Sequence, residues 1–287
     1  KIGLIIYQKK IIKFRKIFRP SFLLPYLREK FAPAVAKNPN KDGYTFSDLF
    51  IWRSDNNWIT KYDYIPYSKL ILLKNLQNYT ENEFFKIIFL SHTGSLINEA
   101  KINVVKDINI EITKYLDKEL LGESYGSFLI FHKNYLIKDV SKNGYISDRG
   151  YISYKYKKNN TFSYIHGNLD AISSTYMSSG LSELTFTRST ILERVYRLQY
   201  IFKQNLNYEL LITNPTKDKQ IIELMFLNKK RKIIDFKKFK LNSLGVSIRK
   251  LSYYQEDYFV CIKSKIPLAR PTIFKFKDNN FIDVFHG

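Results

Sequence analysis

Apolar and polar residues alternate along much of the middle and the end of the chain. Tyr154 and Tyr156 stand between polar neighbours in residues 153–159, and residues 274–277 read Phe-Lys-Phe-Lys. Residues 103–113 alternate in the same way, with isoleucine at every second position from Ile108 to Ile112. A period of two, with aromatic and β-branched residues at the apolar positions, is typical of half-buried strands. The pattern therefore predicts a chain made mainly of strands.

Residues typical of turns interrupt this alternation at short intervals. They include Gly, Pro, Asn and Asp residues at positions 92–94, 142–144, 158–160, 214–216 and 278–280. Short strands separated by such turns every 8–12 residues or so are typical of antiparallel sandwiches and barrels.

The chain also contains two copies of one pattern. KYKKNNTFSYIHG (residues 155–167) and KFKDNNFIDVFHG (residues 275–287) share six identical positions out of thirteen. Three further pairs follow the same order in both halves: residues 58–66 with 208–215, 84–104 with 221–241, and 127–131 with 259–263. Chance explains one such match more readily than four in one order, so we predict an internal duplication.

Three segments of the second half carry a resemblance to a known family. They are LLITNPTKDKQIIELMFL (residues 210–227), KLNSLGVSIRKL (240–251) and YFVCIKSKIPLARPTIFKF (258–276). These segments resemble the tandem Ig-like β-sandwich repeats of bacterial surface and secreted proteins. The first half resembles them only loosely, because Ile65-Pro66-Tyr67 replaces Asn214-Pro215-Thr216. The resemblance implies adhesion, a spacer role or glycan contact, and the fold alone does not choose among these.

The predicted fold class is all-β, with two tandem Ig-like antiparallel β-sandwich domains related by internal duplication and a short N-terminal extension. The expected boundaries are residues 1–44 for the basic extension, 45–170 for the first domain, 171–190 for a connector and 191–287 for the second domain. Both domains have the length of ordinary sandwiches.

The chain of 287 residues has a formal net charge of +21, from 47 Lys and Arg against 26 Asp and Glu. Lysine supplies 36 of those cations, and Lys, Ile, Asn, Tyr and Phe are all abundant. These are the residues that AT-rich codons encode, so we favour base composition over an evolved polyanion site, for which Arg is the better residue. The positive field still attracts nucleic acid, anionic lipid or acidic glycan in a salt-dependent way.

The N-terminal residues 1–19 mix apolar and basic side chains. On a helix they would give an irregular apolar stripe with a basic face, and packing on the main body is favoured over lying on an anionic membrane. No apolar stretch approaches the roughly 20 residues of a membrane-spanning helix, so no transmembrane segment is expected. No secretory cleavage site follows an apolar core. Localisation, surface-associated or cytoplasmic, and oligomeric state stay open.

Two tryptophans, an arginine and several carboxylates lie within residues 47–63. The candidate ligand-binding residues are Trp52, Arg53, Asp55, Trp58 and Asp63. Aromatic faces stack on sugar rings while carboxylates take the hydroxyls, and two carboxylates at the right separation would hydrolyse a glycosidic bond. The competing interpretation, favoured for at least one tryptophan, is a core role, because a spacing of six residues puts both on one face of one strand.

His166 and His286 occupy equivalent positions at the ends of the two copies, and glycine follows each. If the two rings meet between the domains, they would form a metal or acid–base site with Asp170 and Asp283. The favoured interpretation is structural: each His-Gly closes a strand, and duplication alone repeats the feature.

Other signals for chemistry are weak. The Lys-rich residues 228–232 and 236–240 are interpreted as a solvated turn, or as protection of an edge strand, rather than as nucleic-acid contacts. Cys261, the single cysteine, excludes an intrachain disulfide and a Cys-based zinc cage, and its apolar neighbours predict a buried structural thiol. The sequence has no phosphate loop, nucleophile elbow or zinc-protease motif.

We therefore predict a non-enzymatic binding or structural module that needs no cofactor and contacts an acidic glycan or another surface protein. Two alternatives stay open. One is an enzyme with a His–carboxylate site, with or without a metal, at the interface of the two domains. The other is non-specific nucleic-acid binding through the basic surface.

Overall fold

The structure is a computed structural model that describes most of the chain beyond the N-terminal extension. The described residues are 45–55, 58–64, 84–103, 109–116, 124–132, 150–156, 160–167, 171–174, 184–185, 189–251, 254–266 and 270–287. The predicted extension, residues 1–44, lies outside them. A short 3₁₀ helix, η2 (Ile112–Tyr115), occurs within these ranges. The same ranges contain no helix with the length and apolarity that crossing a membrane requires.

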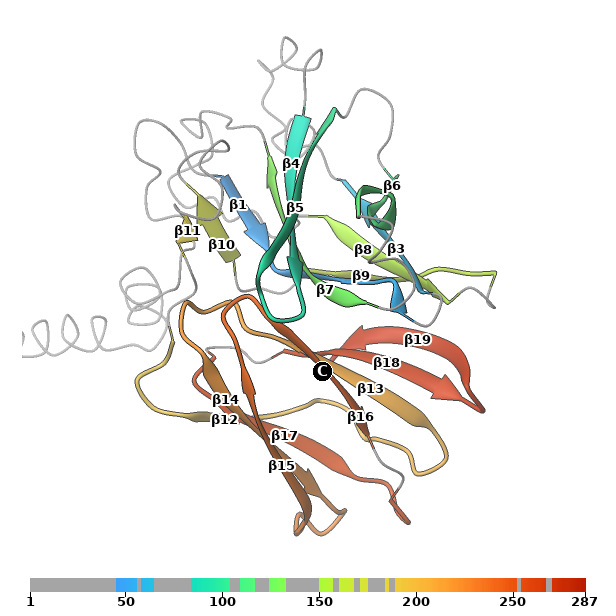
Figure 1. Cartoon of the computed structure of the whole chain (residues 1–287). Coiled ribbons are helices and arrows are strands. Elements are labelled where there is room, and N and C mark those ends of the chain that lie inside the picture. The colour runs from blue at the N-terminus through green and yellow to red at the C-terminus, as the bar shows by residue number, and fades with distance from the viewer. Residues whose placement is uncertain are drawn as a thin grey trace, which may run out of the picture.

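Eight strands build the first of two sandwich-like units (Figure 1). They are β2 (Phe50–Arg53), β3 (Trp58–Asp63), β4 (Phe84–Ser91), β5 (Leu96–Asn103), β6 (Asn109–Glu111), β7 (Tyr125–His132), β8 (Tyr151–Tyr156) and β9 (Ser163–His166). Antiparallel pairing arranges them in two sheets with the orders β2-β7-β4-β5 and β6-β3-β8-β9.

Eight further strands build the second unit. They are β12 (Arg194–Arg197), β13 (Asn207–Thr213), β14 (Gln220–Leu227), β15 (Ile233–Leu241), β16 (Val246–Leu251), β17 (Phe259–Ser264), β18 (Thr272–Lys277) and β19 (Asn280–His286). Their sheets have the orders β12-β17-β14-β15 and β16-β13-β18-β19.

The two units therefore have the same strand order. Each strand of the first unit corresponds to the strand numbered ten higher in the second, in both sheets. All four sequence pairs fall on corresponding strands, as the β4–β5 and β14–β15 hairpins show. The predicted all-β fold, with two duplicated antiparallel sandwich units, is confirmed.

The strand order differs from that of an immunoglobulin domain at the ends of each unit. In immunoglobulin domains the first strand pairs in one sheet and the last strand in the other. Here the first strand, β2 or β12, pairs with β7 or β17, where an immunoglobulin domain has its last strand. The seventh strand of each unit, β8 or β18, pairs with β3 or β13, at the position that the first strand occupies in an immunoglobulin domain. Both folds have two antiparallel sheets, but the first and seventh strands of each unit have exchanged positions relative to an immunoglobulin domain.

Alternation along the strands accounts for the two cores. Every second residue of β3 from Trp58 to Tyr62 is buried, and so is every second residue of β14 from Gln220 to Phe226. The alternation in residues 109–113 does not continue as one strand, however. β5 ends at Asn103, and β6 is followed by η2, in which the successive residues Ile112 and Thr113 are both buried.

Short strands also occur in the predicted connector. β10 (Ala171–Ser174) pairs with both β1 (Thr45–Asp48) and β11 (Leu184–Thr185), which gives a three-stranded antiparallel sheet. Residues just before and just after the first unit thus pair with each other. The domain boundaries expected from the sequence stay a prediction.

The sheet β16-β13-β18-β19 has apolar side chains on both faces. Leu210 and Ile212 belong to the core of the second unit, whereas Leu211 and Phe274 join the core of the first. Figure 1 shows this sheet lying against the first unit, with β19 next to β9. The units therefore pack through an apolar junction.

Candidate functional site: a groove between the two units

Four of the five candidate ligand residues lie at this junction or in the first core. Trp52 and Arg53 belong to β2, Asp55 follows β2, and Trp58 and Asp63 belong to β3. All but Asp63 are buried.

The two tryptophans lie on different strands, so the expectation of a shared strand face is wrong. β2 ends at Arg53 because the N–H groups of Ser54 and Asp55 both donate to the Ser124 carbonyl, at 3.0 and 2.9 Å. Trp58 then begins β3 in the opposite sheet. Both indoles are buried, which is the core placement that we favoured for at least one of them.

Trp52 is a packing residue of the first unit. Its Nε1 donates to the Leu90 carbonyl at 3.0 Å. Gly126 lies so close to the ring that a Cβ there would be 2.8 Å from Nε1. The indole therefore offers no face on which a sugar can stack.

Arg53 connects the two units. Its Nη2 and Nε donate to Asp55 at 2.6 and 2.9 Å, and its Nη1 donates to Glu209 of β13 at 2.6 Å. The guanidinium also lies over the rings of Trp58 and Phe274, 4.7 and 4.8 Å from their centroids. Its planar fork allows both the paired hydrogen bonds and the stacking, which an ammonium group does not. Arg53 thus fixes one unit against the other.

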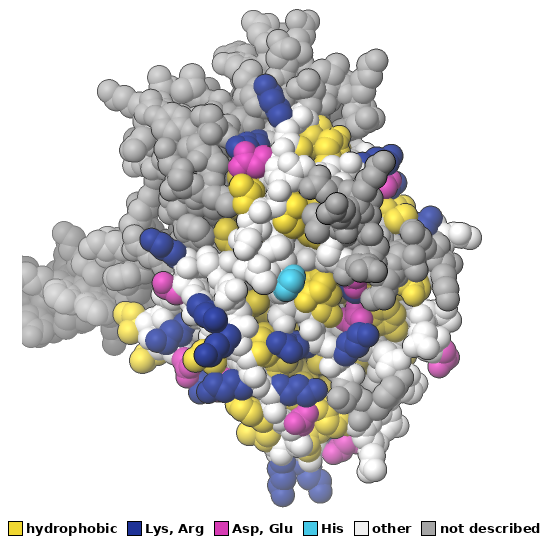
Figure 2. Space-filling model, viewed as in Figure 1, with side chains coloured by type: hydrophobic (Ala, Val, Ile, Leu, Met, Phe, Trp, Pro, Cys, Tyr) yellow, Lys and Arg dark blue, Asp and Glu magenta, His cyan; other side chains and the backbone are white. Residues whose placement is uncertain are grey.

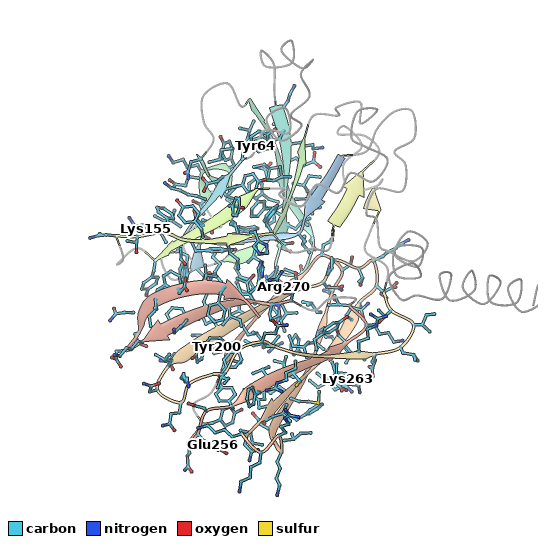
Figure 3. The ribbon with its side chains drawn as sticks, turned by 180° about the vertical axis from the view of Figure 1, so that it is seen from behind. Tyr64, Lys155, Tyr200, Glu256, Lys263 and Arg270 are labelled. Atoms are coloured by element: carbon cyan, nitrogen blue, oxygen red, sulfur yellow. The ribbon has the colours of Figure 1, made fainter. Side chains whose placement is uncertain are left out.

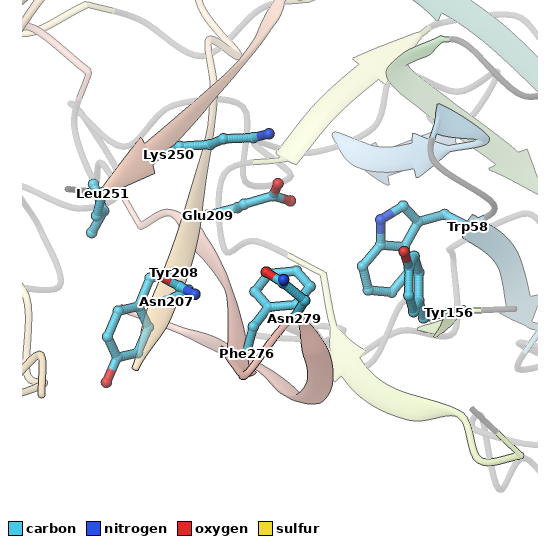
Figure 4. A pocket seen from close by; sticks show the side chains of 9 residues that line it. All are labelled: Trp58, Tyr156, Asn207, Tyr208, Glu209, Lys250, Leu251, Phe276 and Asn279. Atoms are coloured by element: carbon cyan, nitrogen blue, oxygen red, sulfur yellow. The ribbon is translucent and has the colours of Figure 1, made fainter. Parts of the chain in front are cut away.

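A groove of about 490 Å³ opens beside this contact, between the two units. Trp58 and Tyr156 line it from the first unit, and their ring centroids lie 5.2 Å apart. Phe276 lines it from the second unit, 6.2 Å from Trp58. Figure 4 shows the Trp58 and Tyr156 rings on one side and the residues of the second unit on the other. We call this cavity the aromatic groove.

Polar groups of the second unit complete the aromatic groove. Glu209 and Lys250 are direct partners across β13 and β16. The amides of Asn207 and Asn279 lie nearby in the lining (Figure 4). The half-buried rings of Tyr156 and Phe276 can therefore pack against a flat apolar surface, while the amides, the carboxylate and the ammonium group of the groove exchange hydrogen bonds with hydroxyls.

Asp63 lies at the other end of β3 and does not line this groove. Burial raises the pKa of its carboxyl, although a hydrogen bond from Asn109 and the charge of Lys61 oppose that change. The five candidate residues therefore do not form one site, and Trp58 alone among them lines the aromatic groove.

His166 and His286 do meet, at the ends of β9 and β19. Their ring centroids are 4.7 Å apart, and His286 Nε2 donates to the His166 carbonyl at 2.8 Å. His166 Nδ1 donates to the Gly167 carbonyl, also at 2.8 Å. These bonds assign the tautomers, so the lone pairs of the neutral rings sit on His166 Nε2 and His286 Nδ1.

Burial lowers the pKa of His286 to about 4, and the charges of Arg270 and His166 act in the same direction. Figure 3 labels Arg270 where the two units meet. The described residues contain no group of three His, Cys, Asp or Glu side chains that could hold a metal. Asp283 instead accepts a hydrogen bond from Ser163 Oγ at 2.5 Å. Asp170, the fourth residue of the predicted set, lies outside the described residues.

Comparisons with known proteins leave the family open. No protein-family model and no curated protein matches the chain. A solved structure of a glycosyl hydrolase family 2 member from Bacteroides cellulosilyticus is similar at 10 % identity and a TM-score of 0.15, over 85 % of this chain and 26 % of that one. A beta-glucuronidase from glycoside hydrolase family 2 is similar at 11 % identity and a TM-score of 0.14, over 88 % and 26 %. The chain thus spans 26 % of the length of both proteins. Scores this low carry no argument about fold or function.

Most of the aromatic groove was not predicted from the sequence. The alternating pattern places Tyr156 and Phe276 on strands without indicating a groove. Glu209, Lys250 and Asn279 lie in segments that were read for the duplication and the fold, and no candidate site included them. One signal was present: Tyr156 and Phe276 occupy equivalent positions in the two aligned copies. Both rings lie at the junction, where each packs against Trp58.

Proposed function

We propose that the protein is a non-enzymatic binding module that holds a saccharide in the aromatic groove. The half-buried rings of Tyr156 and Phe276 carry this proposal, because the CH face of a sugar ring packs on aromatic rings. The buried Trp58 packs against both of them. Asn207 and Asn279 are placed to exchange hydrogen bonds with sugar hydroxyls. The groove volume of about 490 Å³ falls in the range of small-ligand sites, roughly 300–1,000 Å³.

The rigidity of the groove supports the same proposal. Arg53 joins Asp55 of the first unit to Glu209 of the second, and Trp58 packs edge-on against Phe274 and Phe281 at 5.0 and 4.7 Å. Walls fixed in this way need little ordering when a ligand binds. The resemblance to Ig-like repeats of bacterial surface proteins agrees with a glycan-associated or surface-associated role.

This function is tested by probing a glycan array with the full chain. Calorimetry then measures the affinity for any saccharide that the chain retains. Tyr156→Leu keeps an apolar side chain but removes the stacking face, and we expect about a tenfold loss of affinity, or about 1.4 kcal/mol. Tyr151→Leu is the matched control, because Tyr151 is exposed on the same strand and does not line the groove. An array without signal, or equal losses in both variants, would contradict the proposal.

A second candidate function rests on the contact between His166 and His286. An enzyme at this junction would use one ring as a base or metal ligand, with the nearby carboxylates in support. Metal analysis of the purified chain discriminates between the two candidates. A stoichiometric metal that is lost in both His166→Ala and His286→Ala would favour the enzyme over the binding module.

A further inference from the structure

A second groove, of about 380 Å³, lies at the junction and is lined by three cations and by no carboxylate. Lys219, Lys240 and Arg249 come from the second unit, and His92 and Tyr125 from the first. We call it the cationic groove. It is distinct from the aromatic groove, because the adjacent β16 residues Arg249 and Lys250 line different grooves. Successive side chains of a strand point to opposite faces.

The three cations have no acidic partner among the described residues. Lys238, two positions before Lys240 on β15, shows the contrast, because it pairs with Glu223 at 2.9 Å. Figure 2 shows Lys and Arg side chains gathered over the second unit on the face where β15 and β16 run. Like charges that share a groove repel one another, and a bound anion relieves that repulsion.

Arg249 is the fixed member of the set. Its guanidinium stacks on Phe239, 3.9 Å from the ring centroid. Its Nε is buried and finds no hydrogen-bond acceptor in the part of the chain that the structure describes. A buried donor without an acceptor is rare in native proteins, and a bound water or ion is one way to satisfy it. Arginine is also the residue that binds planar oxyanions with two parallel hydrogen bonds.

We propose that the cationic groove binds an oxyanion group, a sulfate or carboxylate, of an acidic saccharide. Arg249 and the two lysines hold the anionic group. Tyr125 and His92, whose ring centroids lie 5.5 Å apart, offer ring surfaces for the sugar, and the hydroxyl of Ser247 in the lining is placed to bond one of its hydroxyl groups. The proposal does not depend on the function of the aromatic groove.

Calorimetry of the full chain with a sulfated disaccharide, and with the same disaccharide after desulfation, tests this site. We expect binding of the sulfated form and at least about a tenfold loss in Lys219→Gln/Lys240→Gln/Arg249→Gln. The matched control is Lys230→Gln/Arg231→Gln/Lys232→Gln, which removes the same charge from the exposed β14–β15 turn and should change the affinity by less than about twofold. Arg249→Lys keeps the charge but loses the planar fork, and should weaken binding several-fold.

Equal losses in the two triple variants would overturn the proposal, because they would show attraction by overall charge alone. Equal binding of the sulfated and desulfated forms would also overturn it. So would a single-stranded DNA oligonucleotide that binds more tightly than the sulfated disaccharide and loses that binding in Lys219→Gln/Lys240→Gln/Arg249→Gln. Lys219 and Lys240 are exposed, so a Lys219→Gln/Lys240→Gln variant keeps the test valid if Arg249→Gln reduces folding. Tyr156→Leu should leave sulfate-dependent binding unchanged, which separates this site from the aromatic groove.

Discussion

Arg53 is buried although it carries a full charge, and its surroundings explain why. Two carboxylates, one from each unit, and two aromatic faces replace the water that it loses on folding. The sequence identified Arg53 as notable but assigned it to a ligand. Spacing within residues 47–63 could not reveal Glu209, which lies 156 positions away. The ion pair of Arg53 was therefore not predicted, because its partner Glu209 is distant along the chain.

Replacing Arg53 with Met tests this role. Arg53→Met keeps the packing volume but leaves Asp55 and Glu209 without their cation, so we expect a loss of about 3–5 kcal/mol in the free energy of unfolding by urea. Lys86→Met, which removes a more exposed strand ion pair with Glu99, should cost about 0–1 kcal/mol. Adding Glu209→Gln to Arg53→Met should restore part of the loss. Equal effects of the two single variants would contradict the role of Arg53 at the junction.

His286 makes stability depend on pH. Its pKa in the folded chain is lowered to about 4 from the usual 6.5 by burial and by the charges of Arg270 and His166. The unfolded chain therefore binds more protons between these values, and the His286 contribution falls as the pH drops from about 6.5 towards about 4. His286→Gln should flatten that part of the urea-midpoint profile. An NMR titration placing His286 near 6.5 would refute the prediction.

The burial of Cys261 was predicted correctly from the sequence. Its place in an apolar strand pattern predicted a buried thiol, and the structure buries it in β17. Burial also raises the pKa of the thiol, which lowers its thiolate fraction at neutral pH.

At the scale of elements, the turn between β4 and β5 shows what a local pattern can and cannot predict. Residues 92–94 were predicted as a turn, and they form one. The long-range role of the turn was not predicted: the His92 carbonyl accepts a hydrogen bond from the Val246 N–H of the second unit at 2.9 Å. Local residue preferences predict that the chain turns at residues 92–94. The contact of this turn with the second unit depends on Val246, which is distant along the chain.

Gly94 is the residue that this docking requires. Its φ is +86°, and a Cβ there would be 1.9 Å from the Ser243 carbonyl oxygen. Gly94→Ala should therefore destabilise the chain by about 1–3 kcal/mol in urea unfolding. Ser95→Ala, an exposed change in the same turn, should stay within about 0.5 kcal/mol of the parent. A Gly94→Ala variant as stable as the parent would show that the turn does not dock as described.

At the scale of the whole molecule, the duplication was the most informative feature of the sequence. Matched segments predicted two units, and the repeated strand order confirms them. What similarity between copies cannot show is how the copies pack. Leu211 and Phe274 belong to strands of the second unit but to the core of the first, because the alternate residues of β13 and β18 face outward from their own unit.

The shared core predicts that the two units unfold together. Calorimetry of the full chain should give one transition, whose van't Hoff and calorimetric enthalpies agree. Phe274→Ala should lower the midpoint without splitting the transition, since it removes a buried ring that contacts Trp58 and Tyr154. Two separate transitions in the parent chain would mean that the junction does not couple the units.

Hydrogen exchange of the full chain, with a saccharide found on the array, tests most directly whether the ligand lies between the two units. We predict that the ligand slows exchange on both sides of the aromatic groove at once: in β3 and β8 of the first unit, and in β13 and the β18–β19 turn of the second. Protection confined to one unit, or found only away from these strands, would contradict the account.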